Sequence, residues 1–498
     1  MQAVRYILLF FVSFTSFFAQ AQIQPDNWCG TTGMSPWLKW YHQHKHEIVW
    51  DRNSDTAWLY VPVTMHIVGN NSGSGYYPLE QAMRAVCEMN EQFEDARIRY
   101  YLAEGDGVRY HDNQSWYIHD WEGGSEMINS ERIDGRLNVF VVQDPAGNCG
   151  YSWQDAIVIG KNCSAAGNST WAHEAGHHFS LPHPFYGWEG TDWDYSQPAP
   201  EDIDGYPVEK TNGTNCYDSG DRFCDTRPDY LNYRWNCDDN AESTFFQKDP
   251  DGISFKSDAS LIMGYSFDEC ASRFTPEQIE AMRTNLNTEH ADYQVVFDEQ
   301  PGIDDDLNVE LVSPIDSQLT QYNNISLLWN AVPGATYYAM EISLNPNMQP
   351  RLYYNAVYNQ TSVNVDKTMP NNRVLYWRVL AYSEWDICQP NGEAQIGIFK
   401  TKNFAATSEL EQLLSTDLMP NPVAEGISAL LRISSDLNLD AVLDLHDAAG
   451  RLISQRNVRI YTGENPIEIP TDNFQSGVYI LSLRTEKGTI MRRLVVGR

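Results

Sequence analysis

Residues 173–183 read His-Glu-Ala-Gly-His-His-Phe-Ser-Leu-Pro-His, and this stretch decides how the chain is interpreted. In a helix, His173 and His177 lie one turn apart on the same face, so both imidazoles can reach one metal ion. Glu174 points from an adjacent face, near enough to touch a metal-bound water without ligating the metal. The proline before His183 ends the helix, which lets the third imidazole approach the first two. Three neutral histidines leave a fourth position open on tetrahedral zinc, as in catalytic zinc sites.

Strand and helix patterns on either side of this stretch predict a mixed α/β domain. Strands are expected at 58–68, 137–142 and 155–159, an amphipathic helix at 79–93, and a further helix from about Ser169. Thr275 and Gln278 form a capping box, with Pro276 at the first position of the last helix. The domain is expected to span residues 53–295.

The N-terminus has the pattern of a secretory signal at residues 1–21. Arg5 precedes an apolar run at 6–18, and Ala19-Gln20-Ala21 is typical of a cleavage site. A membrane anchor is the alternative, but the run is too short and contains three hydroxyl residues. Residues 22–52 are then a pro-segment, and the mature chain is exported.

After an acidic linker at 297–306, the chain has only short alternating runs separated by turn residues. This pattern predicts a β-sandwich at 307–404. A second linker at 405–414 leads to another short-strand region at 415–498, which predicts a second all-β sandwich.

Composition narrows the class of protein. The chain has 498 residues, with 34 Lys and Arg against 67 Asp and Glu, and a formal net charge of −33. The acid excess argues against a nucleic-acid partner, because phosphate contacts need Lys or Arg. Hydrophobic residues make up 42% of the chain, which excludes a wholly disordered protein. We expect a monomer without a transmembrane segment.

Nine cysteines is an odd number for an exported chain, so at least one thiol lacks an internal partner. Cys87 shares a helical face with apolar residues and is interpreted as a buried thiol. Cys29 and Cys388 are left over. The disulfide candidates are a pair flanking a hairpin and a cluster of four with three possible pairings, namely Cys149 with Cys163, and Cys216, Cys224, Cys237 and Cys270.

The long motif resembles that of the metzincin zinc endopeptidases, whose pattern is HExxHxxGxxH followed by a methionine-containing turn. Residues 261–266 supply such a turn, and residues 267–278 and 219–226 are similar to segments of the pappalysin branch. The resemblance covers about 240 residues, from Trp58 to Tyr293. It implies an α+β metzincin-type catalytic domain with a mixed sheet and an active-site helix. One departure is Ser180, where the family has Gly because the turn needs a positive φ.

The resemblance implies a role for each residue of the motif. The zinc ligands are His173, His177 and His183, and Glu174 is the general base for hydrolysis of peptide bonds in extracellular proteins. Tyr265 stabilises the oxyanion, or is an ordinary packed tyrosine. Met263 forms an apolar floor under the histidines.

Three further assignments also come from the resemblance. Glu269 lies where relatives carry an acidic pocket residue, which predicts cleavage before Arg or Lys; a solvated carboxylate is the alternative. Cys29, in a Cys-Gly-Thr segment, is expected to hold the zinc and keep a zymogen latent, or to form a disulfide with Cys87 or Cys388. A structural calcium ion is expected at Asp221, Asp225 and Thr226, which could instead be part of a solvated acidic surface.

The two C-terminal regions resemble known modules. Residues 327–379 look like a fibronectin type III or related immunoglobulin-like module. Residues 419–423, 445–451, 477–480 and 492–496 resemble the C-terminal sorting domain of type IX secretion in Bacteroidetes. The latter implies that the type IX machinery is a partner and that the protein is secreted or held at the outer-membrane surface. The rival function is a non-catalytic surface adhesin with a vestigial zinc site, for which Ser180 is the only support.

Overall fold

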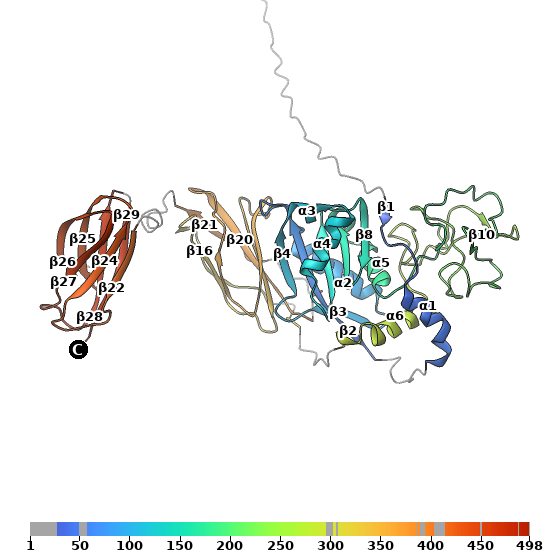
Figure 1. The fold of residues 1–498 in the computed structure, drawn as a ribbon, viewed down its shortest axis with the longest axis horizontal. Coiled ribbons are helices and arrows are strands. Elements are labelled where there is room, and N and C mark those ends of the chain that lie inside the picture. Colours follow the sequence, from blue (N-terminus) through green and yellow to red (C-terminus); the bar gives the residue numbers. More distant parts are fainter. Residues whose placement is uncertain are drawn as a thin grey trace, which may run out of the picture.

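A computed structural model describes residues 27–48, 57–294, 302–304, 307–385, 387–388, 394–402, 414–448, 451–486 and 488–497. The expected signal segment at 1–21 and most of both expected linkers lie outside these residues. The described part contains three bodies, and Figure 1 shows the C-terminal one apart from the other two.

The first domain is built on a seven-stranded mixed sheet, which contains the strands that the sequence predicts. Its order is β1-β8-β9-β6-β2-β3, and β4 also pairs with β2. The β8 strand runs antiparallel to β9, whereas the other neighbours in the sheet are parallel. The strands are β1 (Asn27–Cys29), β2 (Leu59–Gly69), β3 (Ile98–Leu102), β4 (Val108–Asp112), β6 (Leu137–Val142), β8 (Asn148–Trp153) and β9 (Ala156–Gly160).

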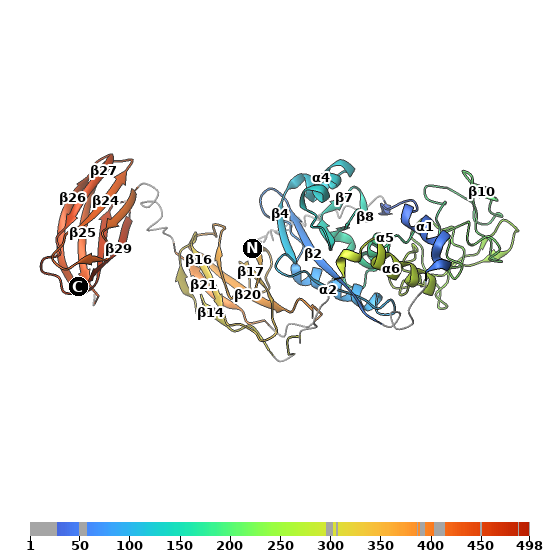
Figure 2. The same cartoon turned by 60° about the horizontal axis from the view of Figure 1, so that its bottom comes forward.

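Helices cover both faces of this sheet (Figures 1 and 2). One face packs against α2 and α5 through the largest core cluster, and the other face packs against α4. The predicted capping box of Thr275 and Gln278 is confirmed at the start of α6. The helices are α1 (Pro36–His44), α2 (Leu79–Gln92), α3 (Gln114–Tyr117), α4 (Trp121–Glu131), α5 (Thr170–His178) and α6 (Pro276–Thr288), with single 3₁₀ turns at Lys45–Glu47, Lys161–Cys163 and Ala291–Tyr293.

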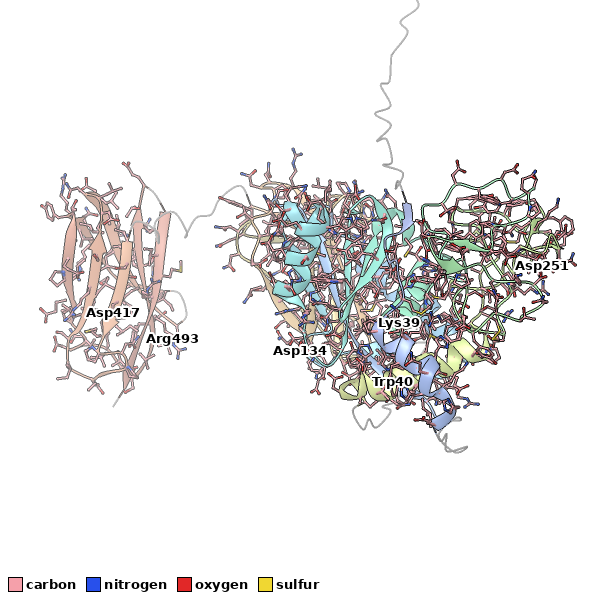
Figure 3. The ribbon with its side chains drawn as sticks, turned by 45° about the vertical axis from the view of Figure 1, so that its right-hand side comes forward. Lys39, Trp40, Asp134, Asp251, Asp417 and Arg493 are labelled. Atoms are coloured by element: carbon pink, nitrogen blue, oxygen red, sulfur yellow. A yellow bond between two sulfur atoms is a disulfide. The ribbon has the colours of Figure 1, made fainter. Side chains whose placement is uncertain are left out.

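A loop-rich region follows α5 and lies on the side of the domain where Figure 3 labels Asp251. It has little regular structure but its own aromatic core, which includes Phe185, Trp188 and Tyr230. Disulfides Cys216–Cys224 and Cys237–Cys270 lie in it, and Cys149–Cys163 joins the hairpin of β8 and β9 to the following turn. The short strands are β5 (Ile118–His119), β7 (Asp144–Pro145), β10 (Asp202–Ile203), β11 (Tyr206–Pro207), β12 (Gln247–Lys248) and β13 (Ser254–Phe255).

The described part of the expected pro-segment, residues 27–48, is anchored at two points. Its first residues form β1 at the edge of the sheet, and α1 packs on α6. Trp37 Nε1 donates to Thr288 Oγ1 at 3.0 Å, and Lys45 pairs with Glu277 at 2.9 Å. Trp40 of the same helix is exposed and is labelled in Figure 3.

The second domain consists of two sheets around a shared core that contains Trp329 and Trp377. The sheets are β14-β16-β19 and β15-β21-β20-β17-β18. The strands are β14 (Leu311–Ser313), β15 (Gln318–Thr320), β16 (Ile325–Trp329), β17 (Tyr337–Ser343), β18 (Arg351–Tyr358), β19 (Ser362–Val365), β20 (Val374–Tyr382) and β21 (Gly397–Thr401).

This second domain is docked on the first rather than tethered to it. Tyr337 and Tyr382 belong to the core cluster of the first domain, and Tyr337 donates from its hydroxyl to the carbonyl of Ala103 at 2.5 Å. A disulfide joins Cys87 of α2 to Cys388. The interpretation of Cys87 as a buried free thiol is therefore wrong, because its place at the rim of the apolar face of α2 meets another domain.

The third body is a further pair of sheets with an independent core, β22-β24-β27 and β23-β29-β28-β25-β26. Figure 3 labels Asp417 and Arg493 in it. None of the described helices is long and apolar enough to cross a membrane. The strands are β22 (Leu414–Met419), β23 (Val423–Ala424), β24 (Ala429–Ser435), β25 (Leu439–Asp447), β26 (Leu452–Ile460), β27 (Gly463–Ile469), β28 (Gly477–Thr485) and β29 (Gly488–Gly497).

Candidate metal centre

Three imidazoles converge at the C-terminal end of α5. Nε2 of His177 lies 3.1 Å from Nε2 of His173 and 3.1 Å from Nε2 of His183. Nitrogens bound at about 2.05 Å to one tetrahedral zinc ion would lie about 3.3 Å apart, so the observed spacing fits a shared ion. Burial lowers the pKa values of His173 and His177, which favours the neutral form that a metal needs. The donor set therefore fits zinc.

An oxygen atom beside the other ring nitrogen orients each imidazole. A proton on Nδ1 that is donated to this oxygen leaves the Nε2 lone pair for a metal, an arrangement typical of histidine ligands. Glu189, which orients His183, lies outside the sequence motif and was not predicted. The acceptors are the carbonyl of Ile262 for His173 at 2.8 Å, the carbonyl of Leu181 for His177 at 2.7 Å, and Oε1 of Glu189 for His183 at 3.4 Å.

The chain reverses directly after α5, and Ser180 makes the reversal. Its φ is 71°, a left-handed value that glycine adopts freely and that is uncommon for other residues. The amide of Leu181 donates to the carbonyl of Gly176 at 3.0 Å, which closes the end of the helix. Asn285 of α6 donates to the hydroxyl of Ser180 at 3.3 Å. A serine at this position therefore supports the turn that brings His183 back.

Glu174 is fully buried between α5 and β8. Its Oε2 accepts a hydrogen bond from Thr31 Oγ1 at 3.3 Å, while Oε1 has no hydrogen-bond partner. Burial raises the pKa of this carboxyl to about 8. A Cβ at Gly150 would lie 2.9 Å from Glu174 Oε1, so a glycine in β8 makes room for the carboxyl.

Two residues of the methionine turn lie against the histidines in different ways. Met263 is buried beneath α5, where a Cβ on Gly176 would meet its sulfur at 2.4 Å. The ring centroid of Tyr265 lies 4.9 Å from that of His183, and its hydroxyl donates to the carbonyl of Cys29 at 3.5 Å. Met263 thus packs under the site, whereas Tyr265 reaches its open side.

Cys29 completes the cluster from the N-terminal segment, residues 27–48. Its Sγ lies 3.4 Å from Nε2 of His177, and its sulfur and the three histidine nitrogens all lie within 4.8 Å of one another. A sulfur and a nitrogen on one tetrahedral zinc ion would lie about 3.5 Å apart. Cys29 is a free cysteine, so the alternative of a disulfide to Cys87 or Cys388 is wrong. Burial and the nearby Glu174 raise the pKa of its thiol.

The β1 strand lies at the edge of the sheet, next to β8. It pairs in parallel with β8, with Cys29 opposite Gly150. Beyond β1, the amide of Gly30 donates to the carbonyl of Gly150 at 2.8 Å, and the amide of Ser152 donates to Thr31 Oγ1 at 2.7 Å. The N-terminal segment therefore occupies the strand position beside Glu174.

The predicted pocket residue Glu269 is exposed, and its neighbour Asp268 carries the contacts instead. Asp268 Oδ2 accepts from Arg234 at 3.0 Å, and Oδ1 accepts from the amide and hydroxyl of Ser169 at 3.0 and 2.8 Å. Arg234 lies outside every motif recognised in the sequence. Asp268 lies within the recognised segment 267–278, but its neighbour Glu269 was predicted as the pocket residue.

The three predicted calcium residues do not all face one point. Asp221 is buried, Thr226 donates to its Oδ1 at 2.8 Å, and its Oδ2 has no hydrogen-bond partner. Asp225 instead accepts from the amide of Glu277 at the start of α6, at 2.8 Å. Glu209 is buried nearby, and burial together with the charge of Asp221 raises its pKa to about 10.

Comparison with known proteins identifies the C-terminal body. The family described as the secretion system C-terminal sorting domain matches residues 417–497. The chain therefore carries the address for export through the type IX secretion machinery, which supports a location outside the cell or on its surface. No curated protein matches the chain.

Two solved structures show only a distant likeness. A "Biofilm associated protein - BSP domain" is 12% identical over 38% of this chain and 29% of that chain, with a TM-score of 0.16. A β-glucosidase from Listeria innocua in complex with glucose is 16% identical over 17% of this chain and 16% of that chain, with a TM-score of 0.14. The chain thus spans less than a third of either structure, and neither carries an argument about this protein.

Proposed function

We propose that the protein is a secreted, zinc-dependent endopeptidase of the pappalysin type of metzincin, made as a latent precursor. The observation that carries the proposal is the convergence of three Nε2 atoms beside a buried carboxyl with one unpartnered oxygen. Hydrolysis at that point would give all four groups a use. Substrates would be extracellular proteins or peptides.

The proposed chemistry divides between the ion and the side chains around it. A zinc ion held by the three histidines would lower the pKa of a water molecule and polarise a peptide carbonyl. Glu174, whose Oε1 is free beside the histidines, is suited to take a proton from water and pass it to a leaving amine. The hydroxyl of Tyr265 is suited to donate a hydrogen bond to the developing oxyanion.

Latency in this proposal comes from the pro-segment. Cys29 takes the fourth donor position, and the hydroxyl of Thr31 donates a hydrogen bond to Glu174. A substrate could not pair with β8 until β1 has left that edge. Activation would therefore require that β1 leaves this edge, and removal of residues 22–52 would make that change permanent.

We also propose a structural calcium ion near Asp221. Asp221 is buried, has one carboxyl oxygen without a hydrogen-bond partner, and lies near the buried Glu209. Burial raises the pKa of both carboxyls, and a bound cation would stabilise their charged forms. Asp225 is engaged at α6 and is the weakest of the three predicted ligands.

Hydrolysis of casein by the activated chain tests the proposed function. Activity should disappear with a chelator and return with zinc. Glu174→Ala should reduce turnover by about 10²- to 10⁴-fold while leaving the zinc content unchanged, because the carboxyl moves protons and does not hold the ion. Activity that survives this substitution would come from another site.

A further inference from the structure

The pro-segment places one large side chain next to the metal centre. The ring centroid of Trp28 lies 4.3 Å from that of His173 and 5.0 Å from that of Tyr265, both edge to face. The Cζ atom of Arg234 lies 4.3 Å from the Trp28 ring centroid. Trp28 directly precedes Cys29, so this side chain fills the position adjacent to the candidate reaction centre.

The guanidinium of Arg234 is fixed by hydrogen bonds along its edges. Nη1 donates to the carbonyl of Ser266 at 2.5 Å, and Nη2 donates to Asp268 at 3.0 Å. Asp268 also accepts from Ser169 at the start of α5, the helix that carries His173. The guanidinium is therefore tied to the same helix as the histidines and is held ready before any ligand arrives.

Arg234 forms an ion pair with Asp268, and the face of its guanidinium meets the Trp28 ring in a cation–π contact. A planar cation held in this way attracts the electron-rich face of an aromatic ring. It would repel the head group of a lysine or arginine side chain. The ring of Phe267 lies 5.3 Å from the same guanidinium and extends the aromatic wall.

We propose that this pocket, lined by His173, Tyr265, Arg234 and Phe267, recognises an aromatic side chain of the protein substrate. Arg234 is its specificity-determining residue, and Trp28 occupies the pocket in the precursor as a substitute for that side chain. The inference rests on the proposed peptidase function. It selects a different substrate class from the Arg or Lys preference that Glu269 predicts.

The first test measures pocket occupancy in the full-length chain without using catalysis. Cys29 is the free thiol beside Trp28, whereas the other eight cysteines form disulfides, so its rate of chemical modification reports whether β1 is docked. The rate is measured with zinc and again after chelation. Trp28→Phe should leave it within about 2-fold of wild type, whereas Trp28→Leu and Trp28→Lys should raise it about 3- to 30-fold.

Variants on the other side of the contact complete this test. Arg234→Lys keeps the charge but loses the planar face, so it should raise the modification rate like Trp28→Leu. Arg227→Lys is the matched control, because Arg227 is an exposed arginine of the same region and pairs with Glu242. If Cys29 were modified at the same rate in Trp28→Leu and Trp28→Phe, the proposal that the pocket recognises an aromatic side chain would be overturned. The Trp28 variants decide the matter even if Arg234→Lys fails to fold.

The second test profiles cleavage of a mixed peptide library by the activated chain. Trp, Tyr and Phe should be enriched at one position beside the cut, and Arg234→Lys should reduce that enrichment about 3-fold or more. Enrichment of Arg and Lys would overturn the inference in favour of Glu269. Cleavage without aromatic enrichment would also overturn it while leaving the peptidase function intact. Absence of any cleavage by wild type would instead contradict the proposed function.

Discussion

Cys29 Sγ lies 3.4 Å from Nε2 of His177, although 148 residues separate the two in the chain. The contact brings a thiol of the N-terminal segment to the imidazole at the centre of the histidine cluster. Two further anchors hold that segment in place, the pairing of β1 with β8 and the packing of α1 on α6. The position of the thiol is therefore fixed by the strand that contains it and by the helix that follows it.

Replacing Cys29 by Ser should release latency. The full-length Cys29→Ser precursor should hydrolyse peptides at least about 10-fold faster than the wild-type precursor, because a neutral hydroxyl is a much poorer zinc ligand than a thiolate. The measurement is peptidase activity before any processing. Once the pro-segment has been removed, the two proteins should be equally active. A Cys29→Ser precursor that stays as inactive as wild type would rule out the switch.

Removing His183 should abolish zinc binding. The full-length chain should hold one zinc ion after dialysis, and His183→Ala should lose it, because a donor set without that imidazole binds far more weakly. Metal analysis of the dialysed proteins gives the result. His178→Gln is the matched control: His178 is a buried neighbour whose Nε2 lies 3.2 Å from the Tyr293 hydroxyl instead. Equal zinc content in both variants would contradict the assignment.

Removing the Cys87–Cys388 disulfide should loosen the second domain. The two cysteines are 301 residues apart, so the bridge constrains the unfolded chain strongly. We compare two double variants, one with Cys87 and Cys388 replaced by Ala and one with Cys216 and Cys224 replaced by Ala, whose separation is 8 residues. The first should lose roughly twice as much free energy of unfolding as the second. Urea unfolding measures both. Equal losses would mean that the entropy of the long loop does not control the effect.

The local pattern of the chain predicted much of the candidate site. The spacing of His173 and His177 needs only helical geometry, and Pro182 with Ser180 marks the reversal that returns His183. The positive φ expected at Ser180 follows from the same turn, and the structure has it at 71°.

Contacts between distant segments were not visible in the sequence. The partners of Cys87 and Arg234 lie in another domain or in an irregular loop, where no periodicity fixes which side chains meet. The second domain was therefore expected to follow a linker as a separate module, whereas its Tyr337 belongs to the core of the first. Position along the chain cannot predict such docking, because it depends on surface complementarity.

A buried histidine far from the metal centre predicts how stability depends on pH. His66 of β2 lies 3.0 Å from His111 and 3.1 Å from Asn138 Oδ1, measured between ring nitrogens and their partners. Burial, with smaller contributions from His111, Arg109 and Arg136, lowers its pKa to about 3. In the unfolded chain the pKa is about 6.5. Between these values only the unfolded chain takes the proton, so stability falls as pH falls from about 6.5 to 3.

The slope of that loss is about 1.4 kcal/mol per pH unit in the middle of the window. His66→Gln cannot take the proton, so its cost in free energy of unfolding should be largest at pH 7 and should shrink steadily towards pH 4. Urea unfolding with a chelator present measures this without interference from zinc. Phe140→Leu is the matched control: Phe140 stacks on His66 at 4.2 Å, so its loss removes packing but leaves the imidazole. A cost of His66→Gln that stays constant with pH, as expected for Phe140→Leu, would show that His66 is not held neutral.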